Sequence, residues 1–68
     1  MEKREVNALA CRFKATTLLL MECNLFDLLE QNIEYAHCAF DTGKYEICKK
    51  TLDLIDAEVV EVLELTEV

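Results

Sequence analysis

The chain has 68 residues, and its 14 acidic side chains outnumber its 7 Lys and Arg, which gives a net charge of −7. This charge argues against direct binding to nucleic-acid phosphates, which needs a basic surface, and against adsorption to an anionic membrane. The hydrophobic fraction of 53% is more than one thin core is expected to bury. We therefore expect one small domain over residues 1–68 that associates with a second copy, with a homodimer favoured.

Long helices are expected because the chain has no proline and a single glycine. We predict an all-α protein with helices over residues 2–22, 24–41 and 44–64, forming a helical hairpin or a small bundle. Apolar residues recur at helical spacing in the first helix: Val6, Ala10, Phe13, Thr17 and Leu20. A different stripe marks the second: Leu25, Leu29, Ile33, Ala36 and Phe40. Asn24 is a plausible N-cap between them, and a single helix bent at Asn24 is the alternative.

The strongest break in the chain is Gly43, because glycine enters the left-handed conformation that commonly ends a helix. After this tight turn, steps of three and four residues define a packing seam along the third helix: Tyr45, Cys48, Leu52, Ile55, Val59 and Val62. Several β-branched valines and acids near the end of this helix favour fraying, or a short extended tail after about residue 63.

Charge is distributed unevenly along the chain. Residues 1–21 carry a net charge of +2, residues 22–43 a net charge of −5 and residues 44–68 a net charge of −4. We expect the basic first helix to lie beside acidic helices, either of the same chain or of a second copy.

Residues 29–60 resemble a single tetratricopeptide repeat, mainly through the stretch TGKYEIC. The matching positions are Ala36 in the first helix, Gly43 at the turn, the aromatic Tyr45, the small Cys48 and the large Leu52. The sequence departs from the repeat at Asn32, where the family favours tryptophan, at Ile55, where it favours alanine, and in lacking the closing proline. The resemblance implies a helical hairpin that binds other proteins and needs stacked neighbours, supplied by the first helix or by a second copy.

We expect no enzymatic activity, no metal and no cofactor. Structural zinc sites pair ligands two to four residues apart, and none of the four cysteines is spaced in that way. The adjacent His37 and Cys38 point about 100° apart on a helix, which suits neither a shared metal nor a thiolate–base pair. Acid pairs one turn apart, such as Asp53 with Asp56 and Glu30 with Glu34, fit solvated helix faces.

The cysteines also bear on the compartment. No secretory signal and no apolar run long enough to cross a bilayer are evident. We therefore expect free thiols and a cytoplasmic protein.

The expected function is that of a protein-interaction module, a regulator, adaptor or inhibitor that docks on a larger protein through a helical face. The candidate contact residues are those left after the core stripes are assigned: Phe26, Tyr35, Leu19, Leu28, Ile47 and Leu54. Phe26 and Tyr35 are favoured because aromatic anchors dominate binding energy. Very short acidic chains are often phage-encoded inhibitors of host complexes, and such an origin is a hypothesis by association only.

An alternative function is imitation of a nucleic acid. An acidic face of Glu58, Glu61 and Glu64 would then occupy the basic groove of a DNA- or RNA-binding protein. One acid every three helical residues gives a spacing near 4.5 Å, against one charge per about 1.7 Å of duplex DNA, so two facing helices would be needed.

Overall fold

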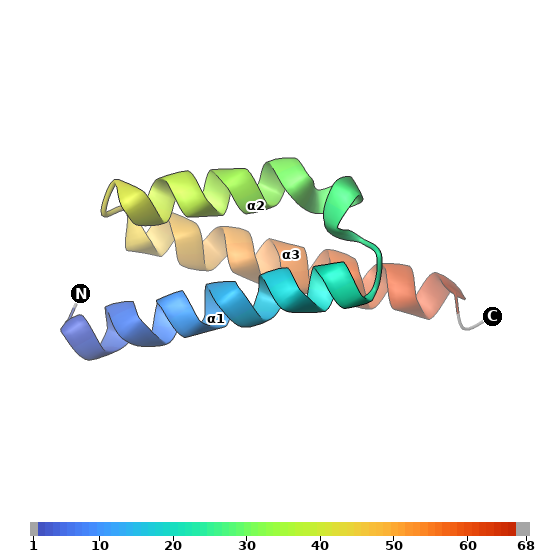
Figure 1. Cartoon of the computed structure of the whole chain (residues 1–68), viewed down its shortest axis with the longest axis horizontal. Coiled ribbons are helices and arrows are strands. Elements are labelled where there is room, and N and C mark those ends of the chain that lie inside the picture. The colour runs from blue at the N-terminus through green and yellow to red at the C-terminus, as the bar shows by residue number, and fades with distance from the viewer. Residues whose placement is uncertain (1, 67–68) are drawn as a thin grey trace.

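The computed structural model describes residues 2–66 as three helices: α1 (Lys3–Glu22), α2 (Phe26–Asp41) and α3 (Tyr45–Thr66). The helices α1 and α3 run in the same direction, and α2 runs antiparallel to both (Figure 1). The body is elongated, measuring 42 × 20 × 17 Å. The prediction of an all-α helical bundle is confirmed, and residues 2–66 contain no strand.

Both connections between helices use the same backbone motif. After α2, the Gly43 N–H donates to the Phe40 carbonyl (3.1 Å) and the Lys44 N–H to the Ala39 carbonyl (2.8 Å). After α1, the Asn24 N–H donates to the Met21 carbonyl (3.3 Å) and the Leu25 N–H to the Leu20 carbonyl (2.8 Å). These pairs of hydrogen bonds are Schellman motifs, which satisfy the last carbonyls of a helix.

The motif requires one residue with positive φ, and this requirement explains the two turn residues. Gly43 adopts φ 79°, as predicted for the tight turn, and Asn24 adopts φ 58°. The interpretation of Asn24 as the N-cap of the second helix is therefore wrong. Asn24 ends α1 because asparagine tolerates the left-handed region better than most side chains. The N-cap position of α2 is Leu25, which makes no side-chain capping hydrogen bond.

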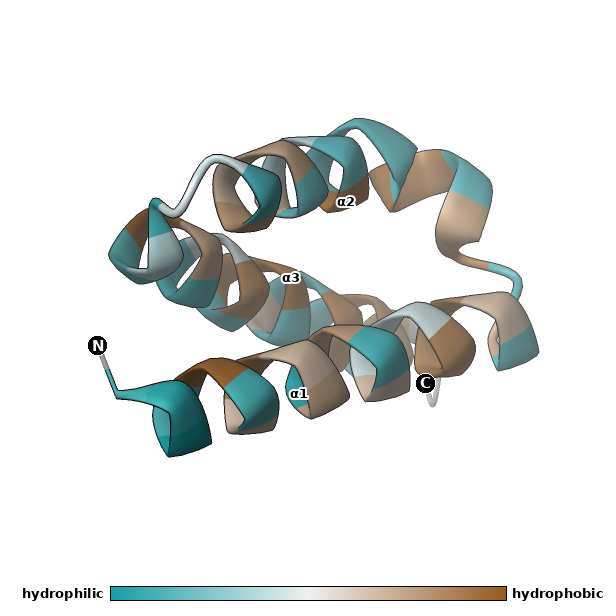
Figure 2. Ribbon diagram, turned by 60° about the vertical axis from the view of Figure 1, so that its left-hand side comes forward, coloured by the Kyte–Doolittle hydropathy of each residue, from teal (hydrophilic) through white to brown (hydrophobic). Residues whose placement is uncertain are grey.

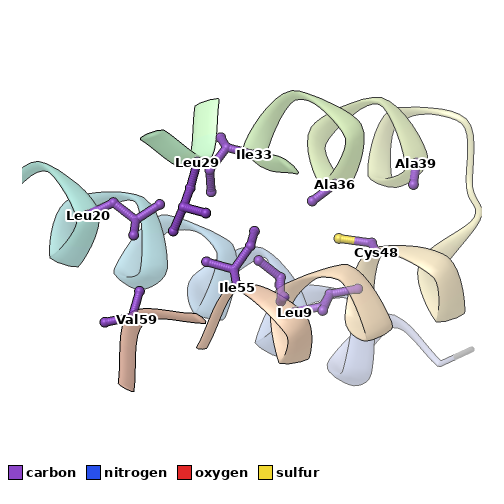
Figure 3. Packing of buried hydrophobic residues seen from close by; sticks show 10 residues of the cluster. Leu9, Leu20, Leu29, Ile33, Ala36, Ala39, Cys48, Ile55 and Val59 are labelled. Atoms are coloured by element: carbon purple, nitrogen blue, oxygen red, sulfur yellow. The ribbon is translucent and has the colours of Figure 1, made fainter. Parts of the chain in front are cut away.

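The core lies where the three helices meet and follows the predicted stripes of α2 and α3. From α2 it takes Leu29, Ile33, Ala36 and Ala39, and from α3 Cys48, Leu52, Ile55 and Val59. Figure 3 shows the small residues Ala36, Ala39 and Cys48 near the Gly43 turn, and Leu20, Leu29 and Val59 gathered toward the other end. Small side chains let α2 and α3 approach closely at the turn, whereas the larger Leu20 of α1, Leu29 of α2 and Val59 of α3 fill the far end.

The first helix packs differently from its predicted stripe. Its buried residues are Leu9, Thr16 and Leu20, while Ala10 is exposed and Phe13 and Thr17 are half-buried. On another side of α1, the Arg12 guanidinium contacts Asp53 at 2.5 Å and Asp56 at 2.8 Å on α3. This contact confirms within one chain the expected pairing of the basic first helix with an acidic helix.

The third helix is longer than expected. It continues to Thr66, so an extended tail directly after residue 63 is wrong, and residues 67–68 lie outside the described part of the chain. Figure 1 shows the end of α3 projecting past the ends of its neighbours. No helix within residues 2–66 combines the length and the hydropathy needed to cross a bilayer.

Candidate functional site

Four of the six candidate contact residues share one side of the hairpin made by α2 and α3. Tyr35 and Ile47 line the same shallow pocket of about 170 Å³. Leu28 lies seven residues before Tyr35 on α2, and Leu54 lies seven residues after Ile47 on α3, so each falls two turns away on the same face. We call these four residues the α2/α3 flank.

The flank is apolar and uncovered. Leu28 is 68% exposed, Leu54 64%, Tyr35 59% and Ile47 38%. It faces away from α1, because Tyr35 and His37 are two residues apart on α2 and so point to opposite sides, and His37 is the one that contacts α1. A monomer rarely leaves several large apolar side chains together in water without a binding role.

The other two candidate contact residues lie elsewhere. Leu19 is 40% exposed on α1, away from the flank. Phe26, at the first position of α2, is half-buried and packs against the core beside Leu25. Phe26 also lines a surface pocket with Met21, Asn24 and Asp27, so it is accessible in part, whereas Tyr35 is the more exposed aromatic residue of the two.

A second apolar surface separates α1 from α2. This α1/α2 groove has a volume of about 350 Å³ and is lined by Ala10, Phe13, Lys14, Thr17, Leu18, His37, Phe40 and Asp41. Ala10, Phe13, Thr17 and Phe40 belong to the stripes that the sequence assigned to the core. Phe13, Thr17 and Phe40 are only half-buried and Ala10 is exposed, so these residues line an open groove instead of filling the core. Figure 2 shows the ribbons of α1 and α2, the two helices whose residues line this groove.

The polar groups of His37, Asp41 and Thr17 in the groove are engaged in structural contacts. The His37 ring packs against Phe13 with 5.7 Å between centroids, and its Nε2 atom lies 3.5 Å from the Asp41 carboxylate. Thr17 Oγ1 donates a hydrogen bond to the Phe13 carbonyl (3.0 Å). No nucleophile and base are paired in the groove as covalent catalysis requires.

The acidic face has a clear place in the fold. Glu58, Glu61 and Glu64 are all exposed on the second half of α3, and Glu58 accepts a hydrogen bond of 3.5 Å from the Asn32 side chain of α2. The topology brings residues 15–36 and 51–66 to the same end of the molecule, and these two segments contain nine acids and no Lys, Arg or His. We call this end the acidic half and the rest of the described chain the basic half.

The cysteines do not form a chemical site. Cys11, Cys23, Cys38 and Cys48 are all free, and only Cys48 is buried. Burial raises the pKa of the Cys48 thiol, so this thiol is neutral and packs as a small core residue. Within residues 2–66, no group of three or more His, Cys, Asp or Glu is placed to hold a metal ion.

Sequence reasoning missed two features of these surfaces. Asp53 and Asp56 lie on a solvated face, as interpreted, at 60% and 47% exposed, but both also bind Arg12, which lies 41 and 44 residues earlier and was not anticipated as their partner. The signal available was one arginine on the basic helix and two acids one turn apart. The α1/α2 groove was missed because its lining has the same apolar spacing as a core stripe.

Comparison of the chain with known protein families, with curated proteins and with solved structures gave no match. The resemblance of residues 29–60 to a tetratricopeptide repeat therefore stays a prediction.

Proposed function

We propose that the protein is a small helical interaction module that docks on a larger protein through the α2/α3 flank, as a regulator, adaptor or inhibitor. The observation that supports this proposal is the exposed apolar row across two helices, with Tyr35 59% exposed beside Ile47. Tyrosine is a frequent binding anchor because it buries a large area and loses few rotatable bonds. A cytoplasmic setting, where the thiols stay reduced, is part of the same proposal.

The test is affinity capture from the source cell with the full chain and with a double variant, Tyr35→Ala with Ile47→Ala. We expect loss of about 2 kcal/mol at the aromatic anchor alone, which weakens partner binding about thirtyfold. Val60→Ala is the matched control, since Val60 is 53% exposed but lies on another side of α3. Equal recovery of the same partner with the double variant and with wild type would refute docking through this flank.

Imitation of a nucleic acid is the second candidate. It is supported by the acidic half, whose two segments contain nine acids and no Lys, Arg or His, and in which Arg12 of α1 pairs with Asp53 and Asp56. Binding through Glu58, Glu61 and Glu64 would weaken steeply with ionic strength, whereas apolar docking would change little. Excess duplex DNA would displace a partner bound in this way. A triple variant, Glu58→Gln with Glu61→Gln and Glu64→Gln, that binds as well as wild type would exclude mimicry.

A further inference from the structure

We propose that the α2/α3 flank receives an amphipathic helix of the partner protein, and that this helix carries Lys or Arg at the end that lies beside Glu58 and Glu61. The inference rests on the proposed function, because it concerns the same flank, and it adds the shape and the charge of the partner segment. Three observations support it: the form of the apolar row, the carboxylates at one end of the row, and the packing of α1 on the same hairpin.

The apolar row has the length and the form of a helix-binding surface. The hydrogen bond from Asn32 of α2 to Glu58 of α3 indicates how the two helices are aligned. From the Gly43 turn outward, the exposed side chains of the flank follow in the order Ile47, then Tyr35 and Leu54 at nearly the same level, then Leu28. The row spans about 13 residues of helix, or roughly 20 Å, so about four turns of a partner helix would cover it with one apolar stripe.

The hydroxyl groups beneath the row have partners within the chain. Thr51 is buried between the two flank residues of α3, and its Oγ1 donates a hydrogen bond to the Ile47 carbonyl (2.8 Å). Thr42 lines the same pocket as Tyr35, and its Oγ1 donates to the Cys38 carbonyl (2.9 Å). Apolar side chains of a partner can therefore cover both threonines without leaving either hydroxyl unsatisfied.

Other modes of peptide binding do not suit this face. Residues 2–66 contain no strand, so this part of the chain offers no sheet edge to which an extended segment could add. Proline-rich segments bind grooves lined by several aromatic rings, whereas Tyr35 is the one exposed aromatic side chain of residues 2–66. A helix that packs along α2 and α3, as in a helical bundle, fits the surface better than either.

Charge distinguishes the two ends of the row. Glu58 contacts Asn32 on the flank side of α2, and Glu61 follows Glu58 by three residues on α3. Both acids are exposed, and neither makes an ion pair within residues 2–66. Lys44 lines the pocket at the opposite end, near the Gly43 turn. Lys or Arg of a partner helix is therefore attracted to the Glu58 end, where Asp or Glu would be repelled.

The chain itself contains a helix held in this way. α1 buries leucines against the core, and its Arg12 guanidinium contacts Asp53 and Asp56, two acids three residues apart on α3. Glu58 and Glu61 have the same spacing beside the flank. An apolar stripe combined with a guanidinium that joins two acids is thus a packing mode that this hairpin already uses.

Synthetic peptides and the ¹⁵N-labelled full chain test the shape and the charge of the partner segment. The probe is an amphipathic helix of about 18 residues with leucines along one face and two arginines near one end. One comparison peptide has glutamates in place of the arginines, and another has the probe sequence scrambled so that the apolar face is lost. We expect saturable amide shifts along the flank and about tenfold tighter binding of the arginine peptide than of the glutamate peptide.

Three results with the wild-type chain would overturn the proposal. The first is equal affinity for the arginine, glutamate and scrambled peptides, or no saturable binding of any of them. The second is a set of amide shifts confined to the α1/α2 groove. The third is a set of flank shifts that grow with protein concentration in the absence of peptide, because a second copy would then occupy the flank.

Paired charge variants locate the basic end of the partner helix. Glu58→Lys with Glu61→Lys should weaken binding of the arginine peptide about tenfold and strengthen binding of the glutamate peptide by a similar factor. Glu22→Lys with Glu30→Lys is the matched control: it makes the same change in net charge at exposed positions, and Glu30 points away from the flank because it lies two residues after Leu28. Equal losses in the two double variants would overturn the proposal.

The peptides also separate a failure of this inference from a failure of the proposed function. Capture of a cellular partner that depends on Tyr35 and Ile47, with no peptide binding at the flank, leaves the docking function intact and overturns the helical partner segment. Peptide binding at the flank, with capture that does not depend on these two residues, overturns the docking function instead.

Discussion

Leu52 and Leu54 stand two residues apart on α3 and offer a matched test of how the fold is stabilised. Leu52 is 0% exposed and Leu54 is 64% exposed. Leu52→Ala removes buried methyl groups and leaves a cavity in the core, which costs about 3 kcal/mol. Leu54→Ala removes atoms that are mostly in contact with water, so we expect a change within about 0.5 kcal/mol.

A loss of this size is a large part of the total for so short a chain. At about 0.05–0.15 kcal/mol per residue, 68 residues give a free energy of unfolding of roughly 3–10 kcal/mol. With a urea dependence near 1 kcal/mol per molar, the midpoint of unfolding should fall by about 3 M in Leu52→Ala. If the free energy of unfolding lies at the lower end of this range, Leu52→Ala is substantially unfolded without denaturant.

Urea unfolding followed by far-ultraviolet circular dichroism measures both variants. The titrations are repeated at two protein concentrations, because any self-association would make the midpoint of unfolding depend on concentration. Equal losses at the two positions, or a loss below about 1 kcal/mol at Leu52, would refute the packing of α3 described above.

Three further predictions concern single contacts. Arg12→Met should lower the free energy of unfolding by only about 1 kcal/mol, because the partner carboxylates of Asp53 and Asp56 are 60% and 47% exposed. This loss should shrink in 1 M salt, which screens the charges. A loss that does not change with salt in urea titrations would contradict an ionic contact. Gly43→Ala should lower the free energy of unfolding by about 1 kcal/mol because of the positive φ alone, since an added Cβ meets no atom within 4 Å. Calorimetry that shows no loss of stability would contradict this backbone strain. Burial raises the pKa of the Cys48 thiol in the folded protein. The contribution of this thiol to the free energy of unfolding is therefore complete below the ordinary thiol pKa of about 8.5, and it is lost as the pH rises through the higher pKa of the folded state. Cys48→Ala should flatten that alkaline decline in the urea midpoint, and an unchanged slope would exclude the thiol as its source.

The sequence predicted α2 and α3 well because their pairing is local. Gly43 and its flanking stripes lie within one hairpin, and the core residues Ile33, Ala36, Leu52 and Ile55 follow the expected spacing. The position of α1 involves long-range contacts instead, such as that of Arg12 with two aspartates more than 40 residues later in the chain. Helical periodicity identifies the buried face of each helix, but it does not show which of the two neighbouring helices lies closer to that face.

The same reasoning explains what could be predicted of the candidate surfaces. Leu28, Tyr35, Ile47 and Leu54 were selected because no core stripe needed them, and all four are exposed. Phe26 was selected in the same way and is half-buried, because the first turn of a helix packs against the preceding loop, where helical spacing carries little information. Asn24 was misassigned because asparagine is common both at N-caps and in left-handed turns.

The uneven packing of the three helices has a consequence for the order of folding. Close backbone contacts are most numerous between α2 and α3, and α1 adds fewer to either of them. Short-range contacts of this kind form quickly, so the hairpin is expected to assemble first and α1 to dock later. In hydrogen exchange, the amides of α1 should open at a lower free energy than those buried between α2 and α3. Each opening of α1 would bare the core of the hairpin, which makes the attachment of one helix the step that governs proteolysis and aggregation.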